Sequence, residues 1–335
     1  MIVKTIEIKK PGGIENLSLT DIEQPQVVPG KVLVRWRATS LNFHDYLVAS
    51  GLLPVANGRV PMSDGAGEVV AVGEGVTQWR PGDKVMSVFF PNWLDGRPSL
   101  EKMSAILGET VDGCASEYTC LPANALTAMP DHLEFTEAAT LPCAALTAWR
   151  ALVEEGGLKA GDTVLIEGTG GMSIAALQIA KASGAFVFAT SSSDHKLEQL
   201  KALGADELIN YREDPKWGKT VNRLSSGGVD HVLDVGGEAT LSQSVAAARI
   251  DGNVSLIGVL GGFKARISLP TIFQKNLHIT GIAVGSQKMQ SDMVSAYNAS
   301  GIKPVIDQSF GLSELGEAFQ YQELGEHFGK IVVEI

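Results

Sequence analysis

One segment, Thr163–Ala185, constrains the fold of this chain more than any other. It predicts a short apolar strand over Thr163–Ile166, a glycine turn over Gly168–Ser173 and a helix over Ser173–Ser183, with a second buried strand following at Phe186–Thr190. A strand, turn and helix in this order place the free N–H groups of the helix N-terminus where they can bind phosphate. The pattern therefore predicts a dinucleotide-binding unit; the alternative is a tight strand–helix turn without a ligand.

The glycine turn contributes Gly168, Gly170, Gly171 and Met172 to the predicted phosphate site. The first glycine permits the tight bend, and the second lacks a Cβ, so that the backbone can approach a pyrophosphate. Ser173 replaces the third glycine of the usual pattern. Serine is still small enough for close packing of the helix against the strand.

The end of the second strand predicts which dinucleotide binds. An acidic side chain at this place binds the ribose 2′-hydroxyl of NAD and repels a 2′-phosphate. Here Ser191 takes that position, and Ser192 and Lys196 follow it. Hydroxyl and ammonium groups can hold a phosphate, so we expect NADPH (NADP); a solvated surface lysine is the alternative for Lys196. Asp194 would oppose a phosphate, and we interpret it as the N-cap of a helix over Lys196–Leu203 that points away.

The chain has 335 residues, more than one hydrophobic core usually supports, so two domains are expected. Residues 1–125 carry short strand signals separated by Gly and Pro turns, which predict a compact, barrel-like β unit. Residues 126–287 alternate strands and helices, including a helix expected over Thr136–Glu154, and this alternation predicts a parallel sheet. Residues 288–335 are expected to hold a helix and a final strand.

Composition excludes several classes of protein. The formal net charge is −11 and no cluster of Lys and Arg is present, so nucleic-acid binding is not expected. No apolar run reaches ~18 residues, and the N-terminus lacks the features of a signal peptide, so we expect neither a membrane span nor secretion. Three cysteines, Cys114, Cys120 and Cys143, are too few for a disulfide framework. We therefore expect a cytoplasmic protein.

Several motifs, taken together and in order, resemble the medium-chain dehydrogenase/reductase superfamily, most closely its zinc-independent quinone oxidoreductase-like branch. The resemblance implies an α/β protein with a GroES-like β-rich catalytic domain over 1–125 and 288–335 and a Rossmann doubly wound parallel sheet domain over 126–287. It also implies an active site in the cleft between the domains and a homodimer, which we expect to form through the edge strand near Ile279–Val284. The motifs, besides the glycine turn, are Ala38–Asp45, Asp64–Gly73, Arg80–Val85, Leu141–Trp149, Leu203–Asp206, Ile209–Tyr211 and Gly329-Lys330.

The same resemblance implies further cofactor contacts. Thr147 corresponds to a threonine near the nicotinamide, and Gly258-Val259-Leu260 to a loop that touches this ring. Tyr211 corresponds to a tyrosine beside the adenosine phosphate, although an ordinary strand-end aromatic is an equal alternative.

The residues at the family's metal positions differ from those of its zinc enzymes. Zinc-using relatives take a Cys, a His and a Cys as catalytic ligands, whereas this chain has Asn42, Ser63 and Cys143. The stretch Phe89–Gly113, where those relatives carry four structural cysteines, contains none. We therefore expect no metal. Cys143 lies in an apolar run, so we interpret it as a small buried hydrophobe.

Without a metal to polarise a carbonyl, conjugate reduction is the chemistry expected, with a small molecule such as a quinone or an α,β-unsaturated carbonyl compound receiving the hydride. One alternative is a zinc-free alcohol dehydrogenase or ketone-aldehyde reductase. Another, from a different class, is a dinucleotide-binding protein with a structural or sensing role.

The catalytic candidates lie in one short segment. Asn42 takes a lost ligand position and could bind an oxygen of substrate or cofactor; His44 is the first candidate for a proton donor and Tyr46 the second. A surface or capping histidine is the alternative for His44, and water could replace any protein donor. Asp45 and Asp64 are expected to hold the segment in shape. The aromatic loop 89–98 is expected to rim the substrate pocket, unless it is a packed surface loop.

Overall fold

The computed structural model describes residues 1–335, and the chain forms two compact units. The first comprises Met1–Leu146 with Val284–Ile335, and the second Thr147–Ala283. The sequence placed the boundaries after residues 125 and 287, whereas the structure has them after 146 and 283. Strand pairing explains the first difference, because β7 (Leu126–Ala128) pairs with β5 (Lys84–Ser87) in the sheet of the first unit. None of the helices combines the length and apolar character needed to cross a membrane.

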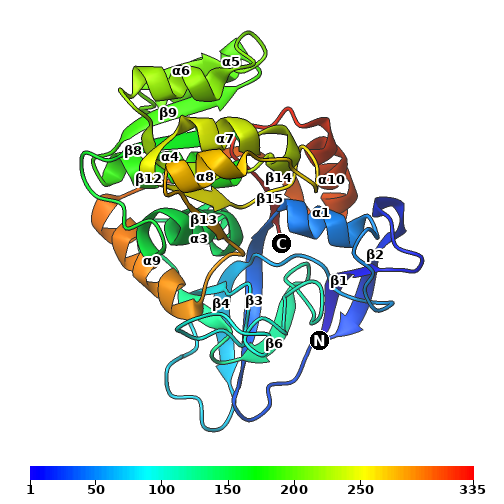
Figure 1. Ribbon diagram of the computed structural model, residues 1–335. Helices are drawn as coiled ribbons and strands as arrows, with labels where there is room; N and C mark the ends of the chain where they lie inside the picture. The colour runs from blue at the N-terminus through cyan, green and yellow to red at the C-terminus, as the bar shows by residue number, and fades with distance from the viewer. The chain divides into compact units, whose positions relative to one another are not determined.

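The first unit is built on a seven-stranded sheet in the order β14-β15-β3-β4-β5-β7, with β6 also paired to β3. β14 and β15 are parallel, and the other pairs are antiparallel. The strand nearest the C-terminus, β15, thus lies beside β3 from the N-terminal part of the chain (Figure 1). The remaining strands are β3 (Lys31–Ser40), β4 (Ala66–Val72), β6 (Tyr118–Pro122), β14 (Ile306–Gly311) and β15 (Lys330–Glu334), and a separate hairpin pairs β1 (Ile2–Ile8) with β2 (Leu17–Glu23).

Alternation along β3 explains the core of this unit. Val32, Val34 and Trp36 are two residues apart, so their side chains leave the same face of the strand, and all three are buried in one cluster. The three cysteines are free thiols. The helical elements of the unit are η1 (Ile14–Asn16), α1 (Phe43–Ala49), α2 (Phe135–Ala138), η2 (Leu141–Ala145), α9 (Gln287–Ser300), η5 (Leu312–Glu314) and α10 (Leu315–Leu324).

The second unit is built on a six-stranded parallel sheet in the order β10-β9-β8-β11-β12-β13. This is the doubly wound order that the family resemblance implies, and the parallel sheet predicted from the alternation of strands and helices is confirmed. Because all strands run in one direction, their carboxyl ends meet at one edge. The strands are β8 (Thr163–Glu167), β9 (Phe186–Ser191), β10 (Glu207–Asn210), β11 (Val229–Asp234), β12 (Ala248–Leu256) and β13 (His278–Gly281).

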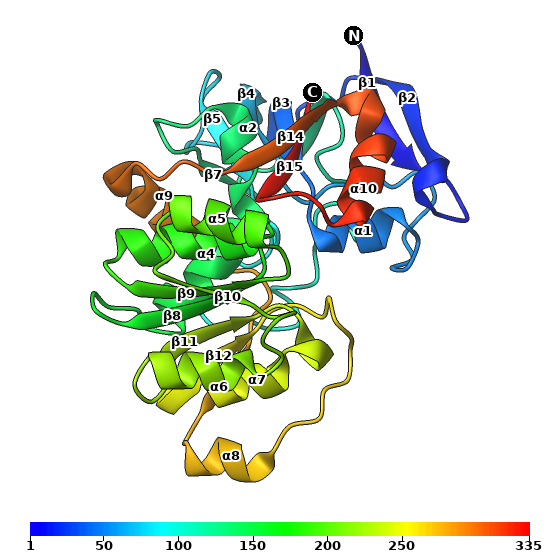
Figure 2. The ribbon, with the colours of Figure 1, turned by 90° about the horizontal axis from the view of Figure 1, so that it is seen from above.

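Helices cover both faces of this sheet. Figure 2 shows α4 and α5 on one face, and α6 and α7 on the other. The helices are α4 (Gly171–Ala182), α5 (Asp194–Ala202), α6 (Trp217–Leu224), α7 (Leu241–Ala247) and α8 (Leu269–Gln274), with a short turn at η4 (Gly237–Ala239).

The prediction of one helix over Thr136–Glu154 is wrong in that the stretch is not a single regular α-helix. The structure divides this stretch into α2, the π-helical η2, α3 (Leu146–Trp149) and the π-helical η3 (Arg150–Glu154). Pro142 has no N–H to donate to the preceding turn, so a regular α-helix cannot pass through it. The Thr140 hydroxyl instead donates to the Glu137 carbonyl at 2.7 Å.

Candidate functional site

The glycine turn joins β8 to α4 as the sequence predicts. Gly168 has φ of +73°, a conformation that favours glycine, and Gly170 is the N-cap of α4 without any side chain bonded to the first turn. A Cβ placed on Gly168 or Gly170 would meet no atom within 4 Å, so the space above the turn is open. Ser173 packs inward, and its hydroxyl donates to the Glu167 carbonyl at 2.7 Å. An open turn with free helix N–H groups fits the pyrophosphate of a dinucleotide.

The end of β9 differs from the prediction in one respect. The N-cap of α5 is Ser193, whose Oγ accepts from the Lys196 backbone N–H at 3.4 Å, so the interpretation of Asp194 as N-cap is wrong. Asp194 is the first residue of the helix, and its carboxylate accepts from Asn210 Nδ2 at 2.8 Å. Serine is itself a preferred N-cap residue, and this signal in the sequence could have identified Ser193. Ser191 is buried at the end of β9.

The other predicted cofactor residues follow neighbouring strands of the same sheet. Tyr211 comes directly after β10, is half-exposed, and donates its N–H to the Ser191 carbonyl at 3.1 Å. Gly258, Val259 and Leu260 come after β12, and the two apolar side chains are exposed. The carboxyl edge of the sheet therefore gathers the glycine turn, the end of β9, Tyr211 and the loop after β12. Thr147 lies elsewhere in this unit, buried on α3.

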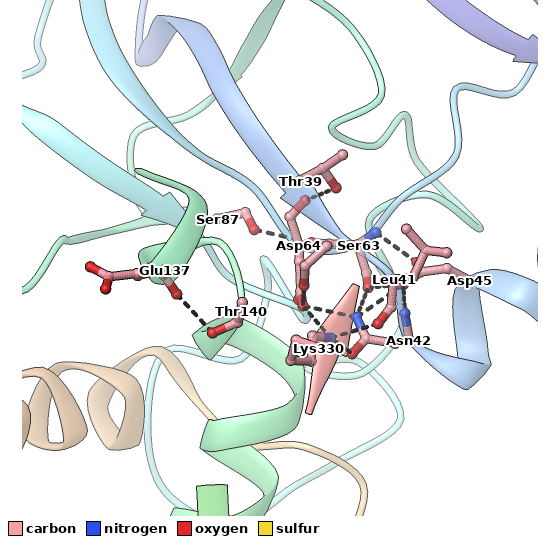
Figure 3. A network of polar contacts seen from close by, with 11 residues as sticks. Thr39, Leu41, Asn42, Asp45, Ser63, Asp64, Ser87, Glu137, Thr140 and Lys330 are labelled. Carbon is pink, nitrogen blue, oxygen red and sulfur yellow. Dashed lines mark hydrogen bonds and ion pairs between the residues drawn. The ribbon is translucent and has the colours of Figure 1, made fainter. Parts of the chain in front are cut away.

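A second cluster, which we name the Asn42 network, lies in the first unit (Figure 3). Asn42 is the N-cap of α1, Asp64 lies shortly before β4, and Lys330 begins β15. The Asn42 amide donates to Asp45 Oδ2 at 2.9 Å and to Asp64 Oδ2 at 2.8 Å, while its oxygen accepts from Lys330 Nζ at 2.6 Å. Lys330 also donates to the Leu41 carbonyl at 2.6 Å and lies 3.7 Å from Asp64 Oδ2.

This network engages both N–H groups of the Asn42 side chain within the first unit. The amide carries only two such donors, and both go to carboxylates in a site where Asn42 is 8% exposed. Asn42 thus anchors its segment, with no N–H left to donate to a substrate oxygen. Sequence reasoning marked Lys330 only as part of a motif and missed this contact, because nothing local in the sequence links the two residues.

Burial shapes the electrostatics of the Asn42 network. It raises the pKa of Asp64 to about 6, against the lowering effect of the nearby Lys330 ammonium. Asp64 accepts from Ser40 and Asn42 through Oδ2, whereas its buried Oδ1 has no hydrogen-bond partner. Asp45 accepts from the Ser63 backbone N–H at 2.7 Å. The two aspartates therefore make the structural contacts expected of them.

The two predicted proton donors differ in their partners. His44 Nε2 lies 3.2 Å from Glu109 Oε2, at ion-pair distance but outside hydrogen-bond geometry, and its ring meets the edge of Phe89. The Tyr46 hydroxyl donates to Glu323 Oε1 at 2.6 Å, and this bond raises the pKa of Tyr46. Tyr46 is thereby a weaker acid than an ordinary tyrosine. Glu109 was missed, since it lies in an irregular loop without a motif.

The aromatic side chains of the loop expected to rim the substrate pocket pack inward, and its place at a pocket stays a prediction. Phe89, Phe90 and Trp93 are all buried, and their rings contact one another in series. They belong to the interior of the first unit because the loop folds back on itself, with Trp93 Nε1 donating to the Gly96 carbonyl at 2.8 Å.

Comparisons with known proteins agree with this arrangement. A model of the alcohol dehydrogenase GroES-like domain matches residues 28–131, and a model of zinc-binding dehydrogenases matches residues 171–299. A zinc-type alcohol dehydrogenase-like protein of Schizosaccharomyces pombe is 45% identical over 333 residues, which are 96% of each chain. The chain belongs to the medium-chain dehydrogenase/reductase superfamily. The predicted family, its GroES-like domain and the accompanying α/β fold are thus confirmed, and the protein is an oxidoreductase of this superfamily.

Two solved structures of this superfamily are also similar. The crystal structure of an NAD-dependent alcohol dehydrogenase is 34% identical, with a TM-score of 0.91 and 99% of each chain covered. A 2-octenoyl-CoA carboxylase reductase, solved with NADP and 2-octenoyl-CoA, is 26% identical with a TM-score of 0.88, covering 99% of this chain and 87% of the other.

The residues at the positions of the family's catalytic zinc do not fit that ion. Asn42 and Ser63 offer an amide and a hydroxyl, and Asn42 already contacts the Lys330 ammonium, a cation that would repel a second one. Burial raises the pKa of the Cys143 thiol well above its usual range, whereas zinc binds the thiolate. No group of three His, Cys, Asp or Glu side chains is arranged to hold a metal ion.

Proposed function

We propose that this chain is an NADPH-dependent, zinc-independent reductase that transfers hydride to a quinone or an α,β-unsaturated carbonyl compound. The Asn42 network carries this proposal, because a buried lysine–aspartate–asparagine cluster replaces the metal that would polarise a simple carbonyl. Conjugate acceptors spread negative charge onto oxygen, where hydrogen-bond donors can stabilise it without a metal.

The residues of the chain have distinct proposed roles. A bound nicotinamide dinucleotide would supply the hydride. The backbone of Gly168, Gly170, Gly171 and Met172 would bind the pyrophosphate at the N-terminus of α4. At the end of β9, Ser191, Ser192 and Lys196 would hold a 2′-phosphate, with Tyr211 beside them. Thr147, Gly258, Val259 and Leu260 would contact the nicotinamide end.

His44 is the group that we propose to deliver a proton to the reduced substrate. Glu109 Oε2, 3.2 Å from His44 Nε2, can orient the ring. Asn42 would act on this site only by holding the segment that carries His44.

The relatives support two reaction types. The carboxylase reductase was solved with 2-octenoyl-CoA, a compound whose double bond is conjugated to a carbonyl, and this favours conjugate reduction. The NAD-dependent alcohol dehydrogenase favours the alternative of an alcohol dehydrogenase or ketone-aldehyde reductase. A structural or sensing role with negligible turnover is the third possibility.

A screen of NADPH consumption with quinones, enals, enones and simple ketones tests the proposal. We expect turnover with a quinone or a conjugated carbonyl, unchanged after incubation with a chelator. Turnover restricted to simple ketones would support the second reaction type. Loss of turnover with chelator, restored by zinc, would contradict metal independence. Cofactor binding without oxidation by any acceptor would support the sensing role.

If Lys196 binds the 2′-phosphate, its removal should weaken the binding of NADPH and not that of NADH. The Lys196→Ala variant should raise the KM for NADPH by about tenfold or more, with little change for NADH, because a charge-assisted hydrogen bond to the 2′-phosphate is lost. Steady-state kinetics with both cofactors measure this. Lys201→Ala removes an exposed lysine from the last turn of the same helix and is the matched control. Equal changes for both cofactors in Lys196→Ala would refute the assignment.

The proposed proton donor predicts a loss of turnover at His44. His44→Ala should lower kcat by about 10²-fold, the typical contribution of a general acid, and should alter the pH profile. Glu109→Gln should have a smaller effect in the same direction, because the ring is retained but its carboxylate partner is lost. Full turnover of His44→Ala across the pH range would show that water supplies the proton.

We also propose a homodimer formed through β13. This strand is the edge of the six-stranded sheet, and the large apolar side chains of Leu269 and Phe273 on the neighbouring α8 are exposed. An open strand edge beside exposed apolar groups favours pairing with a second copy. Light scattering of the protein in solution would measure the assembly.

A further inference from the structure

A pair of buried carboxyl groups lies directly beneath the glycine turn. Glu167 ends β8 immediately before Gly168, and Asp234 ends the neighbouring strand β11. Their side chains are 3% and 0% exposed. No step proposed above uses either group.

The hydroxyl of Ser244, on α7, lies between the two. Ser244 Oγ is 2.6 Å from Glu167 Oε1 and 2.6 Å from Asp234 Oδ2, and it also lies 3.1 Å from the Thr240 carbonyl. A serine hydroxyl has one proton, so it can donate to only one of these oxygens. The other 2.6 Å contact needs a proton that comes from a carboxyl group.

Glu167 is the group that carries this proton. Burial raises the pKa of Asp234, but this carboxyl also accepts from the Gly237 N–H at 2.8 Å and from the Thr240 hydroxyl at 3.0 Å, and these bonds oppose the effect of burial. Glu167 has a single backbone contact, in which Oε2 accepts from the Val235 N–H at 3.3 Å. Burial, reinforced by the charge of Asp234, raises the pKa of Glu167 to about 8. The proton order is then Glu167 O–H to Ser244, and Ser244 O–H to Asp234.

The groups that are hydrogen-bonded to this pair come from β11, the turn at η4 and α7, and none of them is a cation. β11 supplies Asp234 and the Val235 N–H, the turn at η4 supplies the Gly237 N–H and Thr240, and α7 supplies Ser244. Ionisation of Glu167 would therefore leave two carboxylates facing one hydroxyl proton, without a compensating charge.

Glu167 also contacts two parts of the candidate cofactor site, one through its main chain and one through its carboxyl group. Its own backbone carbonyl accepts from Ser173 in the first turn of α4. Through Val235 it reaches the loop after β12, because the Val235 carbonyl lies only 2.4 Å from where a Cβ on Gly258 would stand. Glu167 thus contacts the first turn of α4 through its main chain and Val235, the residue after β11, through its side chain.

We propose that Glu167, as a neutral carboxylic acid hydrogen-bonded through Ser244 to Asp234, is a positioning residue that holds the dinucleotide-binding turn, so that cofactor affinity falls when Glu167 ionises. The inference rests on the proposed function, since it concerns the same cofactor. Repulsion between the two carboxylates would separate the ends of β8 and β11, and with them the glycine turn and the loop after β12.

Binding of NADP⁺, measured by calorimetry from pH 7 to pH 9.5, tests this inference. In the wild type we expect the affinity for NADP⁺ to fall by about tenfold over this range, which is the usual size of coupling between two binding sites, here the proton and the cofactor. Glu167→Gln keeps the shape and neutrality of the acid, so its affinity should change by less than about threefold. Asp234→Asn removes the other charge of the pair and should likewise flatten the dependence. Glu207→Gln, at the exposed amino end of β10, should follow the wild type.

Infrared spectroscopy of the protein without cofactor gives an independent readout. The wild type should show a carbonyl band of a protonated carboxylic acid at pH 7 that disappears by pH 9.5 and is missing from Glu167→Gln. Absence of the band at pH 7, or a parallel loss of affinity in wild type and Glu167→Gln, would overturn the inference. A wild type that has the band but binds neither NADP⁺ nor NAD⁺ at pH 7 would overturn the proposed function, and the positioning role with it.

Discussion

Replacing Lys330 with methionine should destabilise the protein by about 3–5 kcal/mol, the cost of leaving a buried ionic partner uncompensated. Lys330→Met leaves Asp64, the Asn42 side-chain oxygen and the Leu41 carbonyl without their cationic donor. Chemical denaturation measures the change in the free energy of unfolding, and the melting temperature should fall by roughly 5–15 °C.

Two further variants isolate the cause. Lys303→Met removes an exposed lysine 3.7 Å from Glu137 in the same unit, and it should cost less than about 1 kcal/mol, as surface ion pairs do. Combining Lys330→Met with Asp64→Asn should recover part of the loss, since the unpaired carboxylate is then also removed. If Lys330→Met lowers the free energy of unfolding by no more than Lys303→Met does, the role assigned to the Asn42 network is contradicted.

Stability should fall as the pH rises from 6 to 9. The pKa of Glu167 is raised to about 8 from an ordinary value near 4.5, so the folded state binds a proton that the unfolded state has released. The contribution of Glu167 to the free energy of unfolding is fully present below pH 4.5 and is lost as the pH rises toward 8. The free energy of unfolding should drop by about 2–3 kcal/mol between pH 6 and 9, at 1.36 kcal/mol for each pKa unit. Denaturation in urea at several pH values measures it.

Glu167→Gln should remove most of this slope, because the amide cannot ionise. The pKa of Asp64 is raised to about 6, so its contribution to the free energy of unfolding also falls as the pH rises, but mainly below pH 6. The effects of Asp64 and Glu167 therefore occur over different pH ranges. Glu207→Gln should keep the wild-type slope. An identical slope in wild type and Glu167→Gln would rule out Glu167 as its source.

Local patterns in the sequence predicted much of the second unit. The glycine turn and the strands around it are short, contiguous and periodic, so their type and order follow from neighbouring residues. The first error, over Thr136–Glu154, arose at Pro142, where the backbone departs from a regular helix without losing its helical appearance in the sequence. The second, at Asp194, was a choice between two adjacent residues that both favour an N-cap.

The candidate site in the first unit was less predictable because its contacts are distant in the sequence. Asn42 and Lys330 are 288 residues apart, and the Glu109 contact of His44 comes from an irregular loop. Whether an asparagine has a free N–H depends on such partners, which no local pattern encodes. The inward packing of the aromatic rings at Phe89 was not predictable for the same reason, since only tertiary contacts decide which side chains are buried.

The pairing of β15 with β3 has a consequence for synthesis of the chain. A ribosome releases the second unit in full before β15 emerges, and that unit contains every strand of its own sheet. Residues 38–40 at the end of β3 pair with β15, so this end of the strand lacks that partner until the last strand arrives. An open strand of this kind is a site for incorrect association with other chains. Translation stalled before residue 330 should therefore yield a nascent chain with a folded middle and an exposed end of β3, the state that a chaperone would be needed to protect.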